Sequence, residues 1–179
     1  MKICVYGSAS RNLETCYLDA SRSFGEELAK RGHSLVFGGS MKGLMGATAE
    51  GVAKYGGEIL GIAPRFFEDS DSEKEICSDF IETETMSERK DLFQINADAF
   101  VILPGGIGTF DEFYETIVYK SLGQLDKPVV LYNINGYYDK LEEFMKVAEE
   151  HRFVRVAESN LYECVSTLEE VFRVLEEDI

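Results

Sequence analysis

The chain has few of the residues that bind metals or form disulfides. It contains only two histidines and four cysteines in 179 residues. The cysteines are scattered and form no C-x-x-C pair; they are Cys4, Cys16, Cys77 and Cys164. Without Cys or His at ligand spacing we expect no metal site. Scattered thiols of this kind indicate reduced cysteines in a cytoplasmic protein.

Basic residues and long apolar segments are also scarce. The 18 Lys and Arg residues stand against 33 Asp and Glu, which gives a net charge of −15. Such a field repels polyanions, so we expect no nucleic-acid partner. No apolar run approaches the roughly 18 residues of a membrane span, and the opening MKICVYG has no signal-peptide pattern. We therefore expect no membrane partner either.

The order of segments predicts one α/β domain over residues 1–179, a length that suits a single domain. Apolar β-type runs alternate with helical patterns along the chain. The apolar runs are 2–7, 34–39, 58–64, 80–84, 98–104, 127–133 and 161–165. The helical patterns are 13–31, 43–57, 86–96, from the glycines to 122, 137–150 and from 167. The acidic stretch 65–79 is the least regular. Runs that are apolar throughout are typical of a covered parallel sheet. The prediction is a Rossmann-like, doubly wound parallel sheet with helices on both faces.

Three glycine-bearing segments each follow a predicted strand and lead towards a helix. They are YGSAS (6–10), FGGSMKGLMG (37–46) and PGGIGT (104–109). Ligands of doubly wound sheets bind beyond the carboxyl ends of the strands, where strand order reverses. Tight turns alone would explain any one segment, but three at one edge favour a ligand site. None matches G-x-G-x-x-G after the first strand, and PGGIGT lacks the lysine of a P-loop.

The third segment predicts an anion site. Gly105, Gly106 and Gly108 allow backbone N–H groups to converge at the start of a helix, which carries about half a positive charge. Thr109 adds a hydroxyl donor. Such a site attracts a phosphate locally, in spite of the negative net charge of the chain.

Charged residues surround this predicted anion site. Asp111, Glu112 and Glu115 follow it, and acids are common at helix starts for dipole reasons alone. Three carboxylates beside an anion are nevertheless unfavourable, which suggests that one of them takes part in the chemistry. Arg89 and Lys90 are the nearest cations. Because successive helical residues point about 100° apart, one of the two should face the site.

Two segments carry a resemblance to a known family. MSERK (86–90) followed by ADAFVILPGGIGTFDEFYE (97–115) resembles the LOG (Lonely Guy) family, which has an M-H-x-R-K segment and a P-G-G-x-G-T-x-x-E motif. FGGSMKGLMG and SLGQLDKPVVLYN are similar to two further family segments, so the likeness runs from about residue 2 to residue 150. The family histidine is Ser87 here, and Val118–Tyr119 stand where many members have Thr-Trp. These departures bear on the base pocket.

The resemblance implies a phosphoribohydrolase that needs no cofactor. It would hydrolyse the N-glycosidic bond of cytokinin riboside 5′-monophosphates, and often of AMP, to free base and ribose 5-phosphate. Arg89 and Glu112 would be the catalytic pair, and the protein would be a homodimer with sites near the interface. The full set of expected substrate contacts is Ser8, Gly39, Arg89, Lys90, Gly105, Gly106, Ile107, Gly108, Thr109 and Glu112.

The residues fit this chemistry. Glycosidic cleavage passes through an oxocarbenium-like ribose, which a carboxylate stabilises or captures. Glu112 follows Thr109 by three residues, about one helical turn, so it would reach a ribose held by its 5′-phosphate. Arg89 would hold the phosphate or stabilise charge on the departing base, and the sequence leaves both roles open.

Two other functions fit parts of the sequence. A non-catalytic nucleotide sensor would need the anion site but not Arg89 and Glu112. A pyridoxal-phosphate decarboxylase, suggested by a label that such proteins often carry, would need a lysine that forms a Schiff base and a partner for the pyridine nitrogen. Lys42 and Lys90 are the only lysines near the glycine segments, and neither has that context.

Overall fold

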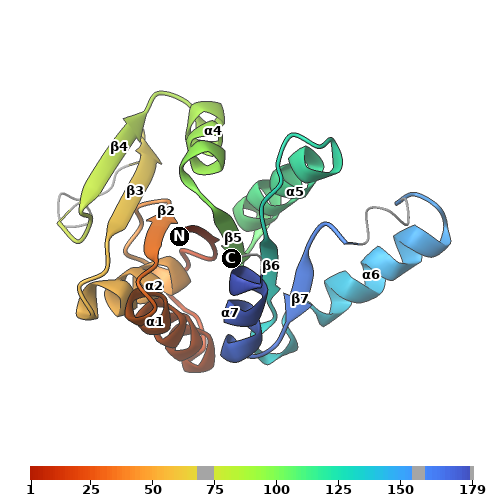
Figure 1. Cartoon of the computed structure of the whole chain (residues 1–179), viewed down its shortest axis with the longest axis horizontal. Coiled ribbons are helices and arrows are strands. Elements are labelled where there is room, and N and C mark those ends of the chain that lie inside the picture. The colour runs from red at the N-terminus through yellow and green to blue at the C-terminus, as the bar shows by residue number, and fades with distance from the viewer. Residues whose placement is uncertain (68–74, 155–159, 178–179) are drawn as a thin grey trace.

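The computed structural model describes residues 1–67, 75–154 and 160–177, so part of the irregular acidic stretch, residues 68–74, lies outside the described residues. The elements, in chain order (Figure 1), are β1 (Lys2–Tyr6), α1 (Thr15–Lys30), β2 (Ser34–Phe37), α2 (Gly43–Lys54), β3 (Ile59–Pro64), β4 (Asp79–Thr83), α4 (Met86–Asn96), β5 (Ala99–Ile102), α5 (Ile107–Ser121), β6 (Val129–Tyr132), α6 (Asp139–Glu150), β7 (Glu163–Val165) and α7 (Leu168–Glu176). A 3₁₀ turn, Ile134–Gly136, precedes α6. Each predicted strand and helix is present, with ends that differ by a few residues.

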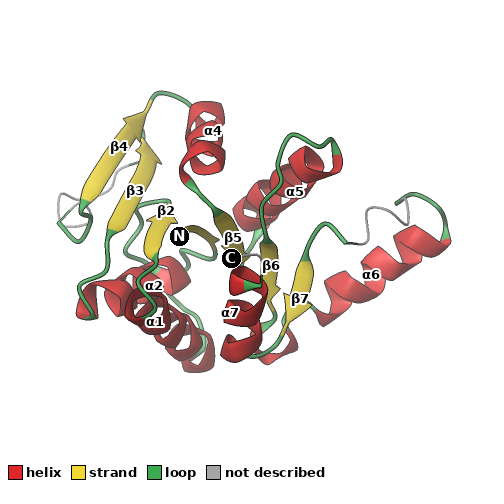
Figure 2. Ribbon diagram, in the orientation of Figure 1, coloured by secondary structure: helices red, strands yellow, loops and turns green. Residues whose placement is uncertain are grey.

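The strands form one parallel sheet, which confirms the predicted fold. Its order is β4-β3-β2-β1-β5-β6-β7 (Figure 2). The central strand β1 pairs with β2 on one side and β5 on the other, so that Cys4 lies beside both Val36 and Phe100. Strand order reverses between β1 and β5. A ligand of this sheet is therefore expected above the carboxyl ends of these two strands.

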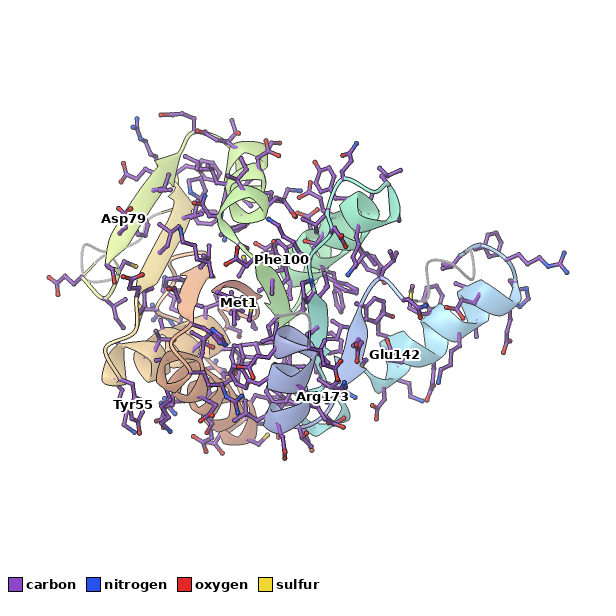
Figure 3. All side chains as sticks on the ribbon, viewed as in Figure 1. Met1, Tyr55, Asp79, Phe100, Glu142 and Arg173 are labelled. Atoms are coloured by element: carbon purple, nitrogen blue, oxygen red, sulfur yellow. The ribbon has the colours of Figure 1, made fainter. Side chains whose placement is uncertain are left out.

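Alternate residues of each strand enter two separate cores, one on each face of the sheet. Ile3 and Val5 of β1 belong to the core covered by α1, α2 and α7. Cys4 and Tyr6 belong to the core covered by α4 and α5, which also contains Phe100 of β5, labelled in Figure 3. This period of two, with both faces apolar, is why the strand sequences read as continuous hydrophobic runs.

Helix α6 differs from the other helices in its surroundings. It extends away from the sheet (Figure 1), and none of its residues is buried. Within the described part of the chain, no helix is long and apolar enough to cross a bilayer.

Candidate active site

A cavity of about 410 Å³ lies above the carboxyl ends of the strands, where strand order reverses. All three glycine segments contribute to its wall, together with the start of α4. Ser8 ties these segments to one another, because its N–H donates to the carbonyl of Pro104 (3.0 Å) and its carbonyl accepts from the N–H of Leu44 (2.8 Å). The predicted site residues in the wall are Ser8, Arg89, Gly106, Gly108, Thr109 and Glu112.

An ion pair spans the cavity floor between α4 and α5. Nη1 of Arg89 donates to Oε1 of Glu112 at 2.9 Å, and the two side chains are only 10% and 12% exposed. Burial of two charges is costly unless they are paired and hydrogen-bonded, as these are. The residues lie 23 positions apart in sequence and meet because the starts of α4 and α5 lie at the same edge of the sheet.

The guanidinium of Arg89 is held by further contacts. Its Nε donates to the carbonyl of Ile62 at 3.1 Å. Its Cζ lies 4.7 Å from the ring centroid of Phe93 and 5.8 Å from that of Phe67, both within cation–π range. The arginine is therefore a fixed part of the wall rather than a mobile surface charge.

Burial changes the acidity of Glu112. Loss of water contact raises the pKa of this carboxyl group to about 7, and the nearby charge and hydrogen bond of Arg89 only partly offset the rise. Both protonation states are thus accessible near neutral pH. A carboxylate with such a shift, inside a cavity and beside an arginine, is typical of a functional site.

The start of α5 has the features of an anion site. Its first residue is Ile107, its N-cap is Gly106, and no side chain caps the helix. By contrast, Oγ1 of Thr85 accepts from the N–H of Glu88 and caps α4. A Cβ added at Gly106 or Gly108 would meet no atom within 4 Å, so this stretch of backbone is open to a ligand. Free N–H groups and the helix dipole together favour a phosphate here.

Four of the predicted contacts do not line the cavity. The Nζ of Lys90 lies 3.2 Å from Oδ2 of Asp111 and 3.0 Å from Oε1 of Glu115, so the lysine links α4 to α5 beside the ion pair. Gly39 packs against Phe80 and Gly105 against Thr109, while the side chain of Ile107 is 90% exposed.

Several cavity residues are not among the predicted substrate contacts; they are Tyr6, Gly38, Ser40, Lys42, Phe67, Met86 and Asp111. Most of them lie in segments that the sequence singles out, and Asp111 is one of the three carboxylates expected beside the anion site. Phe67 carries no such signal, because its place in the wall depends on tertiary packing. Among the described residues, no three His, Cys, Asp or Glu side chains come together as a metal-binding cluster.

Comparison with known proteins identifies the family of the chain. A family model described as "Possible lysine decarboxylase" matches residues 45–175. The chain is 35% identical over 175 residues to cytokinin riboside 5′-monophosphate phosphoribohydrolase LOG5 of Arabidopsis thaliana, covering 98% of this chain and 77% of that protein. The chain belongs to the LOG family. A second LOG protein of the same plant, LOG2, is 35% identical over 176 residues, with 98% and 83% coverage.

Solved structures with lower identity to this LOG-family chain share its fold. The molybdenum cofactor carrier protein of Chlamydomonas reinhardtii superposes with a TM-score of 0.76 at 22% identity, over 98% of this chain and 96% of that one. The protein TM1055 gives 0.74 at 24% identity, over 98% of both chains. At these identities the likeness shows the fold alone.

Proposed function

We propose that this protein is a nucleoside 5′-monophosphate phosphoribohydrolase that acts on cytokinin riboside 5′-monophosphates, on AMP, or on both. The products are the free base and ribose 5-phosphate. The observation that carries the proposal is the buried Arg89–Glu112 pair beside the uncapped start of α5. The printed names of the LOG relatives support the same reaction.

The 5′-phosphate binds at the start of α5. The N–H groups that follow Gly106, together with the hydroxyl of Thr109, donate to the phosphate oxygens, and Ser8 lies in the same cavity wall. Glu112 follows one helical turn after Thr109, so a bound phosphate directs the ribose towards its carboxylate. The N–H of Ile107 is the first of these donors, while Gly39 and Gly105 lie outside the cavity wall.

Cleavage breaks the bond between C1′ of the ribose and the base nitrogen. The bonding electrons leave with the base, which takes up a proton, and C1′ becomes cationic before water adds to it. The charged carboxylate of Glu112 stabilises or captures this cation. Arg89 holds Glu112 through Nη1, and its remaining N–H groups are available to the departing base or to the phosphate.

The site gives no support to the alternative that a lysine acts as the catalytic residue of a decarboxylase. Lys90 is paired with two carboxylates and lies outside the cavity wall. Lys42 lines the cavity, where the buried charged pair is formed by Arg89 and Glu112 and involves no lysine. The description "Possible lysine decarboxylase" therefore has no counterpart in the chemistry proposed here.

We also propose that two copies pair through the surface formed by α5 and α6. These helices border an apolar groove of about 610 Å³. Its wall includes Val118 on α5 and Phe144 and Val147 on α6, which are 51%, 63% and 47% exposed. Helix α6 has no fully buried residue, and an identical chain would cover its exposed apolar side chains in fixed ratio.

We also propose that the protein resides in the cytoplasm. None of the four cysteines, all of which lie in the described residues, forms a disulfide. Reduced thiols suit a reducing compartment.

The decisive experiment compares AMP and N6-isopentenyl-AMP with the corresponding nucleosides. We expect base release from the monophosphates and almost none from adenosine, because the phosphate directs the ribose to the carboxylate. Glu112→Gln should keep the fold and bind AMP, yet lose roughly 10²–10³-fold in kcat, the usual loss when a preorganised charge is removed.

The matched control is Asp111→Asn. This neighbour pairs with Lys90 and its side chain is 55% exposed, so its substitution should change kcat much less. Equal rates on AMP and adenosine would contradict the proposal. AMP binding by the wild type without any base release would favour the nucleotide sensor instead.

A further inference from the structure

The backbone of Gly38 lies directly against the guanidinium of Arg89. Gly38 follows the last residue of β2, and a Cβ built on it would overlap Nη2 of Arg89 and lie 3.4 Å from Cζ. The next residue, Gly39, has a φ of +81°, a conformation that favours glycine by itself. Gly38 is not among the positive-φ residues. Backbone conformation therefore does not require glycine at position 38, whereas contact with Arg89 does.

Two further groups complete a slot for this side chain. The carbonyl of Ile62, at the end of the neighbouring strand β3, accepts from Nε at 3.1 Å. The ring of Phe93, one turn along α4, lies 4.7 Å from Cζ. In the structure the guanidinium makes all three contacts in one placement, with Gly38 beside Nη2. In that placement Nη1 reaches Oε1 of Glu112 at 2.9 Å.

We infer that Gly38 is a positioning residue for the reaction: it keeps the space in which Arg89 reaches Glu112, and it affects turnover through Arg89. This inference rests on the proposed phosphoribohydrolase function. A methyl group at position 38 would force the guanidinium away from Glu112. Because the ion pair is almost fully buried, Arg89 has little room for an alternative placement that keeps the same contacts.

Displacement of Arg89 would also change the titration of Glu112. The arginine is the main influence that lowers the pKa of this carboxyl group against the effect of burial. Without that influence the pKa rises further, so a higher pH is needed to charge the carboxylate. The ionisable groups that face Glu112 are Arg89 and Lys90 from α4, Asp111 from α5, and Cys4 and Tyr6 from β1.

The first test compares Gly38→Ala with Gly57→Ala. A Cβ on Gly57 would also crowd its neighbours, Val52 and Ala29, and this glycine too lacks a positive φ, but it lies outside the cavity wall. We expect Gly38→Ala to lower kcat by roughly 10²-fold, as displacement of a catalytic group by about 1 Å does. The pH at half-maximal activity should rise. Gly57→Ala should lower the melting temperature and leave the pH profile unchanged.

The second test is a double-mutant cycle with Arg89→Lys, which removes the atom that a methyl group would strike. Gly38→Ala should reduce kcat strongly beside Arg89 and less than threefold further beside Lys at position 89. Equal fold-losses in both backgrounds, or a Gly38→Ala enzyme with wild-type kcat and pH profile, would overturn the inference. A wild-type protein that releases no base would instead refute the proposed function.

Discussion

Glu112 is the residue whose charge should control the rate. Its pKa of about 7 means that the charged carboxylate is half populated near neutral pH. Since only the charged form stabilises a ribose cation, we expect kcat/KM for AMP to rise about tenfold per pH unit below 7 and to level off above it. Assays from pH 5.5 to 8.5 test this. A decline through the same range would mean that the protonated carboxyl group is the active form.

The same titration should appear in the stability of the fold. The folded pKa of Glu112 lies above the ordinary value of 4.5, so the folded state favours the protonated form. The resulting stabilisation is fully present below pH 4.5 and is lost as pH rises through about 7. Glu112→Gln lacks this titration. Urea unfolding should therefore show a stability difference between the two proteins that changes by about 3 kcal/mol between pH 4.5 and 8.

Single residues show where sequence reasoning succeeds and where it stops. Arg89 and Glu112 were identified from their motifs, and the structure brings them within 2.9 Å. The role of Gly38 was not visible, because its neighbour Arg89 is 51 positions away and comes from another element. Contacts of this kind depend on tertiary packing, whereas motifs report mainly local chain geometry.

At the scale of elements, two ion-paired contacts join α4 to α5. Beside the Arg89–Glu112 pair, Lys90 contacts Asp111 and Glu115 at 3.2 and 3.0 Å, and its side chain is 17% exposed. The two contacts use successive residues of α4 that point in different directions. Together they fix how the start of α4, which carries the arginine, lies against the helix that carries the carboxylate.

Lys90→Met tests whether this lysine acts between helices or on the ligand. The substitution keeps most of the aliphatic stem and leaves two carboxylates without their cation. We expect a stability loss of about 1 kcal/mol in chemical unfolding, since the lysine is largely buried while Asp111 is 55% and Glu115 28% exposed. The inhibition constant of ribose 5-phosphate should change by less than threefold. A large loss of ribose 5-phosphate affinity would show that Lys90 contacts the phosphate directly.

The elements themselves were predictable because their patterns are local. The strand runs are apolar throughout, and the helices carry recognisable periodicity, so each element was anticipated within a few residues. The 3₁₀ turn Ile134–Gly136 was not, because it depends on Asn135 at a φ of 54° and Gly136 at 71°. Which strands flank β1 was not predictable, because strand order depends on how the whole sheet packs and not on the sequence of any one segment.

At the scale of the whole molecule, an apolar groove lies away from the cavity at the strand ends. This groove lies between α5 and α6, while the cavity opens over the glycine segments, and the described walls of the two have no residue in common. Helix α5 contributes to both, with Glu112 on the cavity side and Val118 on the groove side. A second copy bound at the groove would therefore contact the helix that carries Glu112.

Phe144→Glu tests this proposed pairing. Phe144 is 63% exposed on α6, so a charge there should not disturb the monomer core, yet it would be desolvated between two copies. We expect the wild type to behave as a particle of about 40 kDa, twice 20.1 kDa, in light scattering, and the variant as a monomer with reduced kcat. Tyr55→Glu is the matched control, since Tyr55 is 46% exposed at the far end of the molecule from α6 (Figure 3) and should leave the mass unchanged. A monomeric wild type, or a Phe144→Glu protein that still pairs, would show that this groove is not the contact between copies.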